Sequence, residues 1–369
     1  MLIVTFLLLE TITTGMENVR TALALCFIAQ RNLVLLTNNR ISCINQLRSL
    51  LEDEYGIDDI IEVDLLHSQG DFYKQVTDQM VKRLQGMQPV LHQVIIWKNL
   101  EAVEMDFDRK NSIIRIFNEL EQYNTLRTRD RSSDEPFQFG SYMVNKPEFF
   151  LVILVMKHGR SLPKIHPQIK ERFWFSQYCP IQDGHHHSHH HHLHSKINHG
   201  EHSHSMDDVL DGRQKLTTVF ANAQIQEYVC SLLVFTRSHR LCSLAPLSTR
   251  PTLRALEGIM LLAKALVVLR SAPGDVLFVT PEFIKVAFRK IGYWLVDWET
   301  NTLFNETSME YDYRKKLELT ILTGDWYGSE WETAKDYMEK FSSTKDESTT
   351  TGYTNMVVED VLQSVRPPI

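Results

Sequence analysis

The sequence predicts an α/β fold, in which a parallel sheet forms the core and a helical domain follows it along the chain. Phe149–Met156 is apolar throughout and rich in β-branched residues, which indicates a central strand covered on both faces. Val90–Trp97 is a second strong strand. After residue 210 the apolar residues recur at helical spacing, so a largely helical region is expected there.

Between residues 18 and 52 the pattern predicts a helix, a buried strand, a tight turn and a second helix. A phosphate-binding loop in such a turn needs glycines, whose backbone N–H groups cradle phosphate, followed by Lys and Ser or Thr. Thr37–Ser42 contains no glycine and no Gly-Lys-Ser/Thr. Arg40 and Ser42 could imitate the charge and the hydroxyl, so we assign them to a vestigial phosphate loop.

Most of the sixteen histidines lie between Asp183 and Ser205, among Ser, Gly and Asn. Neutral imidazole binds zinc, nickel or copper, but a defined site needs fixed geometry. A segment with so few apolar residues is expected to be a disordered linker that binds metal only adventitiously. The representative ligands are His185, His187, His189 and His191.

The region after the histidine tract is predicted to form several helices. Asp211–Arg240 has apolar residues at helical spacing and a basic end, which suits the helix dipole. Ser248 or Thr249 is a good N-cap for a helix beginning near Pro251. Thr280 is expected to cap another helix, whose first position is a proline.

Two stretches resemble the magnesium-chelatase and MoxR branch of the AAA+ ATPases. Ser248-Thr249-Arg250, an apolar helix and Thr280-Pro281-Glu282 resemble the helical lid of that branch. Leu162–Phe175, with its leucine-proline turn, short helix and Glu-Arg-Phe, is similar to it as well. The expected division is a P-loop-type parallel core at 1–180, a histidine-rich linker at 181–210, an α-helical lid domain at 211–300 and a C-terminal extension at 301–369.

The resemblance implies roles for two arginines. Arg250 takes the position of the second-sensor arginine, which contacts the terminal phosphate of ATP. Arg172 takes the position of the arginine finger, although Glu171 replaces the Asp of the family. A structural role for Arg172, anchoring Glu171 or a helix end, is an equal alternative. ATP and magnesium are the cofactors that the resemblance implies.

Other functional positions of that branch are altered. Its second catalytic strand ends in Asp-Glu, which position magnesium and activate water, but here the strand ends in Trp97–Asn99. Glu101 and Glu104 follow, and we expect them to lie on a solvated acidic face. At the sensor position after the central strand, the chain offers only Lys157 or His158. The sequence therefore predicts a catalytically degenerate ATPase.

The C-terminal region carries a second resemblance. Ser342–Thr354 is expected to be a Ser/Thr-rich linker, and Thr354–Val365 a last short helix or strand. Val357–Pro368, Arg172–Phe175 and Thr236–Leu241 together resemble the fungal family of maintenance of telomere capping protein 2. That family resembles degenerate chelatase-type ATPases, and its name implies a role in telomere capping.

Composition narrows the possible partners and compartment. With 369 residues, a formal net charge of −7 and a pI near 6.1, the chain lacks a broadly basic surface, so we predict no direct nucleic-acid binding. Five scattered cysteines without a Cys-x-x-Cys pair indicate a reducing, intracellular compartment, the cytoplasm or the nucleus. Met1–Leu9 is apolar but too short to span a bilayer, and no membrane association is predicted.

Three functional hypotheses follow. The first is a degenerate AAA+ protein that acts as a scaffold or adaptor with protein partners, in a homo- or hetero-oligomer as the resemblance implies. The second is an active ATPase subunit of the magnesium-chelatase type, supported by Arg172 and Arg250 and opposed by the missing glycines and acids. The third is a metal-binding protein built around the histidine tract. The sequence favours the first, a pseudoenzyme.

Overall fold

The computed structural model describes residues 15–66, 70–83, 88–129, 136–159, 165–180, 206–239, 242, 251–272, 274–296, 344–346 and 349–368. Arg250, Met1–Leu9 and the histidine tract with His185, His187, His189 and His191 lie outside these ranges. No helix within them is both long enough and apolar enough to cross a membrane.

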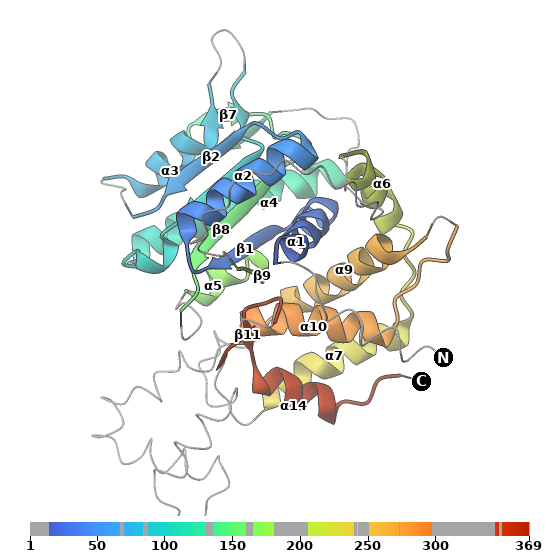
Figure 1. The fold of residues 1–369 in the computed structure, drawn as a ribbon. Coiled ribbons are helices and arrows are strands. Elements are labelled where there is room, and N and C mark those ends of the chain that lie inside the picture. The colour runs from blue at the N-terminus through green and yellow to red at the C-terminus, as the bar shows by residue number, and fades with distance from the viewer. Residues whose placement is uncertain are drawn as a thin grey trace, which may run out of the picture.

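A single sheet of five parallel strands forms the centre of the fold (Figure 1). In spatial order its strands are β2 (Ile60–Asp64), β5 (Val94–Lys98), β8 (Leu151–Lys157), β1 (Asn32–Thr37) and β9 (Phe173–Cys179). β1 therefore lies between β8 and β9, and Leu33 pairs with Ile153 on one side and with Phe175 on the other. The predicted α/β class with a parallel sheet is confirmed.

Helices cover both faces of the sheet. Leu33 and Leu35 belong to one apolar cluster, while Val34 and Leu36 belong to another on the opposite face. This alternation along β1 explains why the strands are apolar in every position. The first face is covered by α1 (Gly15–Ala29) and α2 (Arg40–Tyr55), and the second by α3 (Phe72–Met80), α4 (Phe107–Arg129) and α5 (Pro167–Lys170).

The predicted strand Val90–Trp97 is two strands. β4 (Val90–Leu91) pairs with β3 (Val81–Lys82) in a small hairpin, and only β5 joins the main sheet. The N–H of His92 donates to Met80 O at 3.1 Å, and its Nδ1 lies 2.6 Å from Asp59 Oδ1. His92 therefore marks the point at which the chain leaves the β3–β4 hairpin and approaches the main sheet. A second hairpin pairs β6 (Phe137–Phe139) with β7 (Tyr142–Val144).

The polar stretch at residues 125–139 has regular structure at both ends. α4 continues through Arg129, and β6 begins at Phe137.

A helical domain follows the sheet. It consists of α6 (Met206–Leu216), α7 (Ala223–Ser238), α9 (Leu253–Arg270), α10 (Pro281–Leu295) and the C-terminal α14 (Met356–Ser364). The single helix predicted for Asp211–Arg240 is broken, because Phe220 exchanges backbone hydrogen bonds with the loop before α10: its N–H donates to Leu277 O, and its carbonyl accepts from Val279 N. The spacing of apolar residues in the sequence does not reveal such a tertiary pairing.

The helix caps were predicted with mixed success. Thr280 is the N-cap of α10, and Pro281 occupies its first turn, as predicted. α9 begins two residues later than expected: its cap is Thr252, whose side chain accepts from Arg254 N, rather than Ser248 or Thr249.

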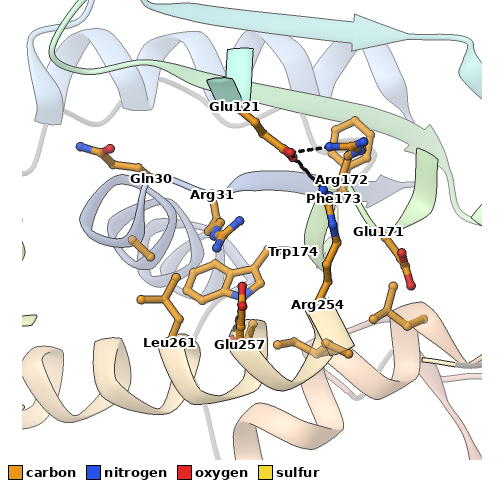
Figure 2. Close-up of a pocket in the computed structure, with 15 residues that line it drawn as sticks. Gln30, Arg31, Glu121, Glu171, Arg172, Phe173, Trp174, Arg254, Glu257 and Leu261 are labelled. Atoms are coloured by element: carbon orange, nitrogen blue, oxygen red, sulfur yellow. Dashed lines mark hydrogen bonds and ion pairs between the residues drawn. The ribbon is translucent and has the colours of Figure 1, made fainter. Parts of the chain in front are cut away.

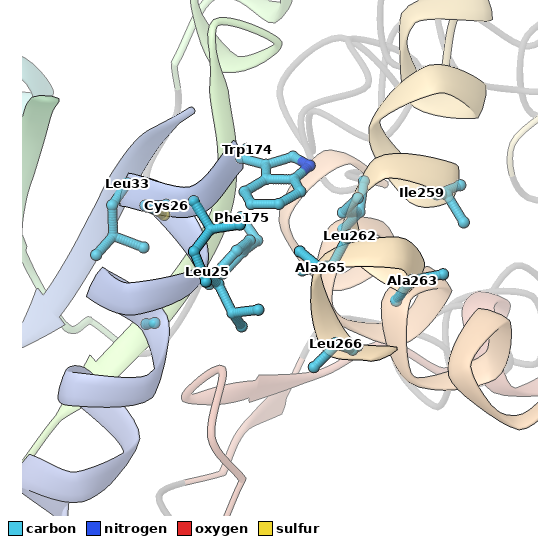
Figure 3. Packing of buried hydrophobic residues seen from close by; sticks show 14 of the residues in the cluster. Leu25, Cys26, Leu33, Trp174, Phe175, Ile259, Leu262, Ala263, Ala265 and Leu266 are labelled. Atoms are coloured by element: carbon cyan, nitrogen blue, oxygen red, sulfur yellow. The ribbon is translucent and has the colours of Figure 1, made fainter. Parts of the chain in front are cut away.

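The sheet and the helical domain share one continuous core (Figure 3). α1 packs against both β9 and α9, and its Leu25 and Cys26 belong to the shared cluster (Figures 1 and 3). Trp174 of β9 donates from Nε1 to Gly258 O of α9 at 3.0 Å. Trp294 of α10 donates in the same way to a carbonyl of α5. Apolar packing and paired indole N–H groups therefore fix the two parts against each other.

One lysine is held inside this interface. The Lys290 ammonium lies 3.2 Å from Gln177 Oε1 and 5.3 Å from the centre of the Phe175 ring. Burial lowers the pKa of Lys290 to about 8, because an ammonium group away from water loses its hydration. The charged form of Lys290 is consequently less favourable in the folded protein than in the unfolded chain.

Replacing Lys290 by Met should therefore stabilise the protein at about pH 7 and flatten its pH dependence. In the wild type the burial penalty is fully present below the folded-state pKa. As the pH rises through that pKa, the folded protein loses the proton that an unfolded lysine keeps up to about pH 10.4. Wild-type stability should then rise toward that of Lys290→Met in urea titrations across this range. Parallel profiles for the two proteins would contradict the assignment.

Candidate functional site

The sheet places a polar crevice at the carboxyl ends of its strands. After β1 the chain crosses one face through α2, and after β8 it crosses the other face through α5. Ligands of open α/β sheets bind at such a switch point. A pocket of about 580 Å³ opens there, and its lining includes the last residues of four strands, Thr37, Asp64, Lys98 and Lys157.

The turn that would cradle a phosphate is short and is already satisfied. Only Asn38 and Asn39 separate β1 from α2. The Asn39 side chain caps the helix by accepting from Ser42 N at 3.2 Å, and its carbonyl accepts from Cys43 N at 3.1 Å. Thr37 Oγ1 donates to the same carbonyl. A protein side chain therefore takes a helix N–H that a phosphate loop would offer to its ligand.

The Arg40 side chain lines the crevice beside this turn. Its guanidinium donates to Asn99 Oδ1 and forms an ion pair with Glu101. Asn99 is held in the left-handed region at φ 67°, and its Nδ2 donates to Asp64 Oδ1 at 2.8 Å. Glu101 also accepts from the backbone N–H of Lys157 at 3.2 Å. These contacts connect the ends of β1, β2, β5 and β8.

The network corrects the expectation for the acids after β5. Glu101, in the short helix η2 (Leu100–Ala102), leaves only 17% of its side chain exposed because it pairs with Arg40. It is therefore not part of a solvated acidic face, whereas Glu104 is exposed as expected. Arg40 retains its predicted place at the vestigial phosphate loop, but it binds protein oxygens.

A second group of charges includes Glu62 and Lys98, which also line the crevice. Glu62 on β2 pairs with Arg48 at 2.9 Å and with Lys98 at 3.2 Å. Partial burial alone would raise the pKa of Glu62, but hydrogen bonds from Lys98 and Arg48 outweigh it and lower the pKa below its usual value. The carboxylate is thus ionised and compensates both cations.

These residues do not fit ATP with magnesium. The acids that would hold the metal are replaced at the end of β5 by Lys98 and Asn99. Asp64 is the acceptor of two hydrogen bonds, from Asn99 Nδ2 and from Leu66 N. Phosphoryl transfer depends almost entirely on positioning and on charge stabilisation by such groups. The crevice supplies neither the backbone cradle nor the metal ligands, so no catalytic step is assigned to it.

The two residues expected at the sensor position, Lys157 and His158, lie in different surroundings. Lys157 lines the crevice and is exposed. His158 is 4% exposed, and its Nε2 lies 2.8 Å from Gly352 O, in the C-terminal segment. Its ring contacts that of Tyr178 at 4.5 Å. His158 therefore packs against protein.

Arg172 lies opposite the crevice, at the amino-terminal end of β9, where it lines a pocket of about 440 Å³ (Figure 2). It forms an ion pair with Glu121 and donates to Asn118 Oδ1 at 2.6 Å. Arg254 of α9 reaches the same Glu121 carboxylate at 3.2 Å (Figure 2). The expected anchor, Glu171, is not its partner. Only 8% of the Arg172 side chain is exposed, which supports the structural alternative.

Sequence reasoning missed three of these partners. Asn118 and Glu121 are one helical turn apart on α4, so their spacing places both on one face. That spacing was a usable signal for a shared ligand. Nothing local to Arg254 indicated that it would join them, because Glu121 is 133 residues away in the chain.

Comparisons with known proteins find similar folds among solved structures. No family model and no curated protein matches the chain. It is similar to the crystal structure of a "putative ATPase" from Cytophaga hutchinsonii, with 11% identity, a TM-score of 0.49, and coverage of 86% of this chain and 92% of the other. It is also similar to a full-length MCM homolog from Methanopyrus kandleri, with 16% identity and a TM-score of 0.43. That match covers 78% of this chain but only 57% of the homolog.

Proposed function

We propose that this chain is a catalytically degenerate AAA+-like protein that acts as a scaffold or adaptor rather than as an ATPase. The observation that carries the proposal is the Arg40 network, in which a guanidinium bound to Asn99 and Glu101 stands in front of α2. The resemblance to the fungal telomere-capping family suggests telomere maintenance as the process it serves.

Binding of ATP would have to disrupt this network. A triphosphate in the crevice would meet the carboxylates of Glu101, Glu62 and Asp64. The cations that pair with Glu101 and Glu62 are already engaged in protein ion pairs. Removing one partner of such a pair leaves a charge uncompensated, which costs more than the pair contributes. The Arg40 and Glu101 charges therefore compensate each other without a ligand, although Arg40 Nε and Glu101 Oε2 are buried without a hydrogen-bond partner among the described residues.

The junction between the sheet and the helical domain also supports a scaffold. A motor needs its domains to move relative to each other, and interfaces that allow motion are small and polar. Here the interface is apolar and includes Trp174 and Trp294, each with its indole N–H bonded across it. A rigid body of this kind suits the presentation of a fixed surface to protein partners.

The proposal predicts that phosphate release from ATP stays at background with the full chain. Arg40→Ala is the informative variant, because it removes the guanidinium beside the first turn of α2. It supplies neither a phosphate-binding backbone cradle nor ligands for magnesium. Its turnover should be as low as that of the wild type. Magnesium-dependent phosphate release by the wild-type chain, lost in Arg40→Ala, would favour the active-ATPase alternative instead.

A further inference from the structure

The C-terminal segment lies along the exposed edge of the sheet. β9 is the last strand on its side, and an unpaired edge strand normally invites other chains to pair with it. Thr350 O accepts from Tyr178 N of β9 at 2.9 Å, and Thr351 O lies 3.5 Å from Ser176 Oγ. Within the segment predicted to be a Ser/Thr-rich linker, β10 (Thr344–Lys345) pairs with β11 (Tyr353–Thr354).

A set of side chains holds this segment on the sheet. His158, just beyond β8, lies with Nε2 2.8 Å from Gly352 O, and its ring contacts that of Tyr353 at 4.8 Å. Tyr353 donates from its hydroxyl to Gly159 O at 2.9 Å. Thr351 and Tyr353 are 3% and 0% exposed. These degrees of burial are those of core residues.

The same segment is attached to the helical domain. Lys290 of α10 donates to Thr350 Oγ1 at 3.2 Å, and Asn355 donates to Val296 O, at the end of α10, at 2.9 Å. Beyond Asn355, α14 packs Val358 against Gly292 of α10. The residues from Thr349 to Asn355 therefore touch both parts of the fold.

This contact lies next to the crevice. Tyr178, whose N–H binds the segment, accepts on its hydroxyl from Asn38 Nδ2 at 3.0 Å. His158 donates its backbone N–H to Thr37 O at 2.8 Å. The two residues that hold the segment are thus bonded directly to the turn where a phosphate loop would lie.

We propose that the edge of β9, together with His158 and α10, is a peptide-binding site that the chain's own Thr349–Asn355 occupies in cis. The bound peptide connects the sheet to the helical domain beside the turn between β1 and α2. This connection requires no nucleotide. This inference deepens the proposed function and rests on it, since a ligand-independent tie is what a rigid scaffold requires.

Gly352 offers a specific way to disturb the site. Its φ is +78°, and a Cβ there would lie 3.1 Å from His158 Nε2 and 3.1 Å from Tyr178 Cβ. Gly274 is a matched control, because its φ of +93° carries the same backbone strain while a Cβ would meet nothing within 4 Å. Gly352→Val and Gly274→Val therefore differ in the contact with the site and share the backbone cost.

Hydrogen exchange of the full chain, read by mass spectrometry, tests the proposal. In Gly352→Val, peptides covering Tyr178 and α10 should exchange at least tenfold faster than in the wild type, while β5 stays protected. Gly274→Val should leave both regions unchanged. Tyr353→Phe, which removes one hydroxyl and no packing, should accelerate the same peptides by about fivefold, the effect of one hydrogen bond.

Unchanged exchange at Tyr178 and α10 in Gly352→Val, or equal acceleration in Gly274→Val, would overturn the peptide site. If Gly352→Val fails to fold, unchanged exchange in Tyr353→Phe would overturn it. The same experiment with ATP and magnesium separates the two proposals. Nucleotide-induced protection of the Thr37–Ser42 peptide in the wild type would contradict the proposed function, whatever the glycine variants show.

Discussion

Replacing Trp294 by alanine should lower the free energy of unfolding by about 4 kcal/mol, the largest effect that we expect from a single substitution. The side chain is fully buried between α10 and the sheet. Its Nε1 donates to Lys170 O at 2.9 Å, and the Lys170 ammonium lies 5.2 Å from the ring centre. Truncation would leave a cavity, an unpaired carbonyl and a buried cation that has lost its aromatic neighbour.

Two further variants separate these contributions in urea titrations followed by circular dichroism. Trp294→Phe keeps most of the apolar volume but removes the indole N–H, so it should cost about 1–3 kcal/mol. Val276→Ala, at a side chain that is 82% exposed, should stay within about 0.5 kcal/mol of the wild type. A loss below about 1 kcal/mol for Trp294→Ala would show that this interface does not hold the fold together.

Replacing Asn355 by alanine should cost about 3 kcal/mol, the second-largest effect. Asn355 is fully buried, and its Oδ1 accepts from Val357 N at 3.0 Å and from Val358 N at 3.3 Å, which caps α14. Its Nδ2 donates to Val296 O. An N-cap contributes about 1 kcal/mol, and the buried carbonyl of Val296 left without its donor adds about 1–3 kcal/mol.

Asn222 provides the matched control, because it caps α7 at an exposed position with a single bond of 3.5 Å to Gln224 N. Asn222→Ala should therefore cost only about 0.5 kcal/mol. Chemical denaturation of both variants under identical conditions makes the comparison. Equal losses would mean that Asn355 acts only as a local cap and that its bond to α10 contributes nothing.

The parts of the fold that sequence could predict are those that depend on local burial. Phe149–Met156 became β8 because an apolar run with β-branched residues fits a strand that is covered on both faces. Thr280 and Pro281 marked the start of α10 because capping depends on a few neighbouring residues. The helix, strand, tight turn and helix predicted between residues 18 and 52 are also present, as α1, β1, the turn Asn38-Asn39 and α2.

The partners of the charged side chains could not be predicted from the sequence. Arg40 meets Asn99 and Glu101 across 59 and 61 residues, and Arg172 meets Glu121 across 51. Periodicity reports which face of an element is buried, but it does not report which distant charge lies there. For the same reason Ser342–Thr354 was taken for a linker, although Tyr353 is one of the largest fully buried side chains of the described residues.

The central claim is that Arg40 and its ion-paired partners line the crevice at the carboxyl ends of the strands, and that this crevice does not bind ATP. Isothermal titration of the full-length protein with ATP and magnesium tests it most directly. We predict no saturable heat for the wild type. Saturable binding at micromolar ATP, weakened by substitution of Arg40 or Ser42, would contradict the account.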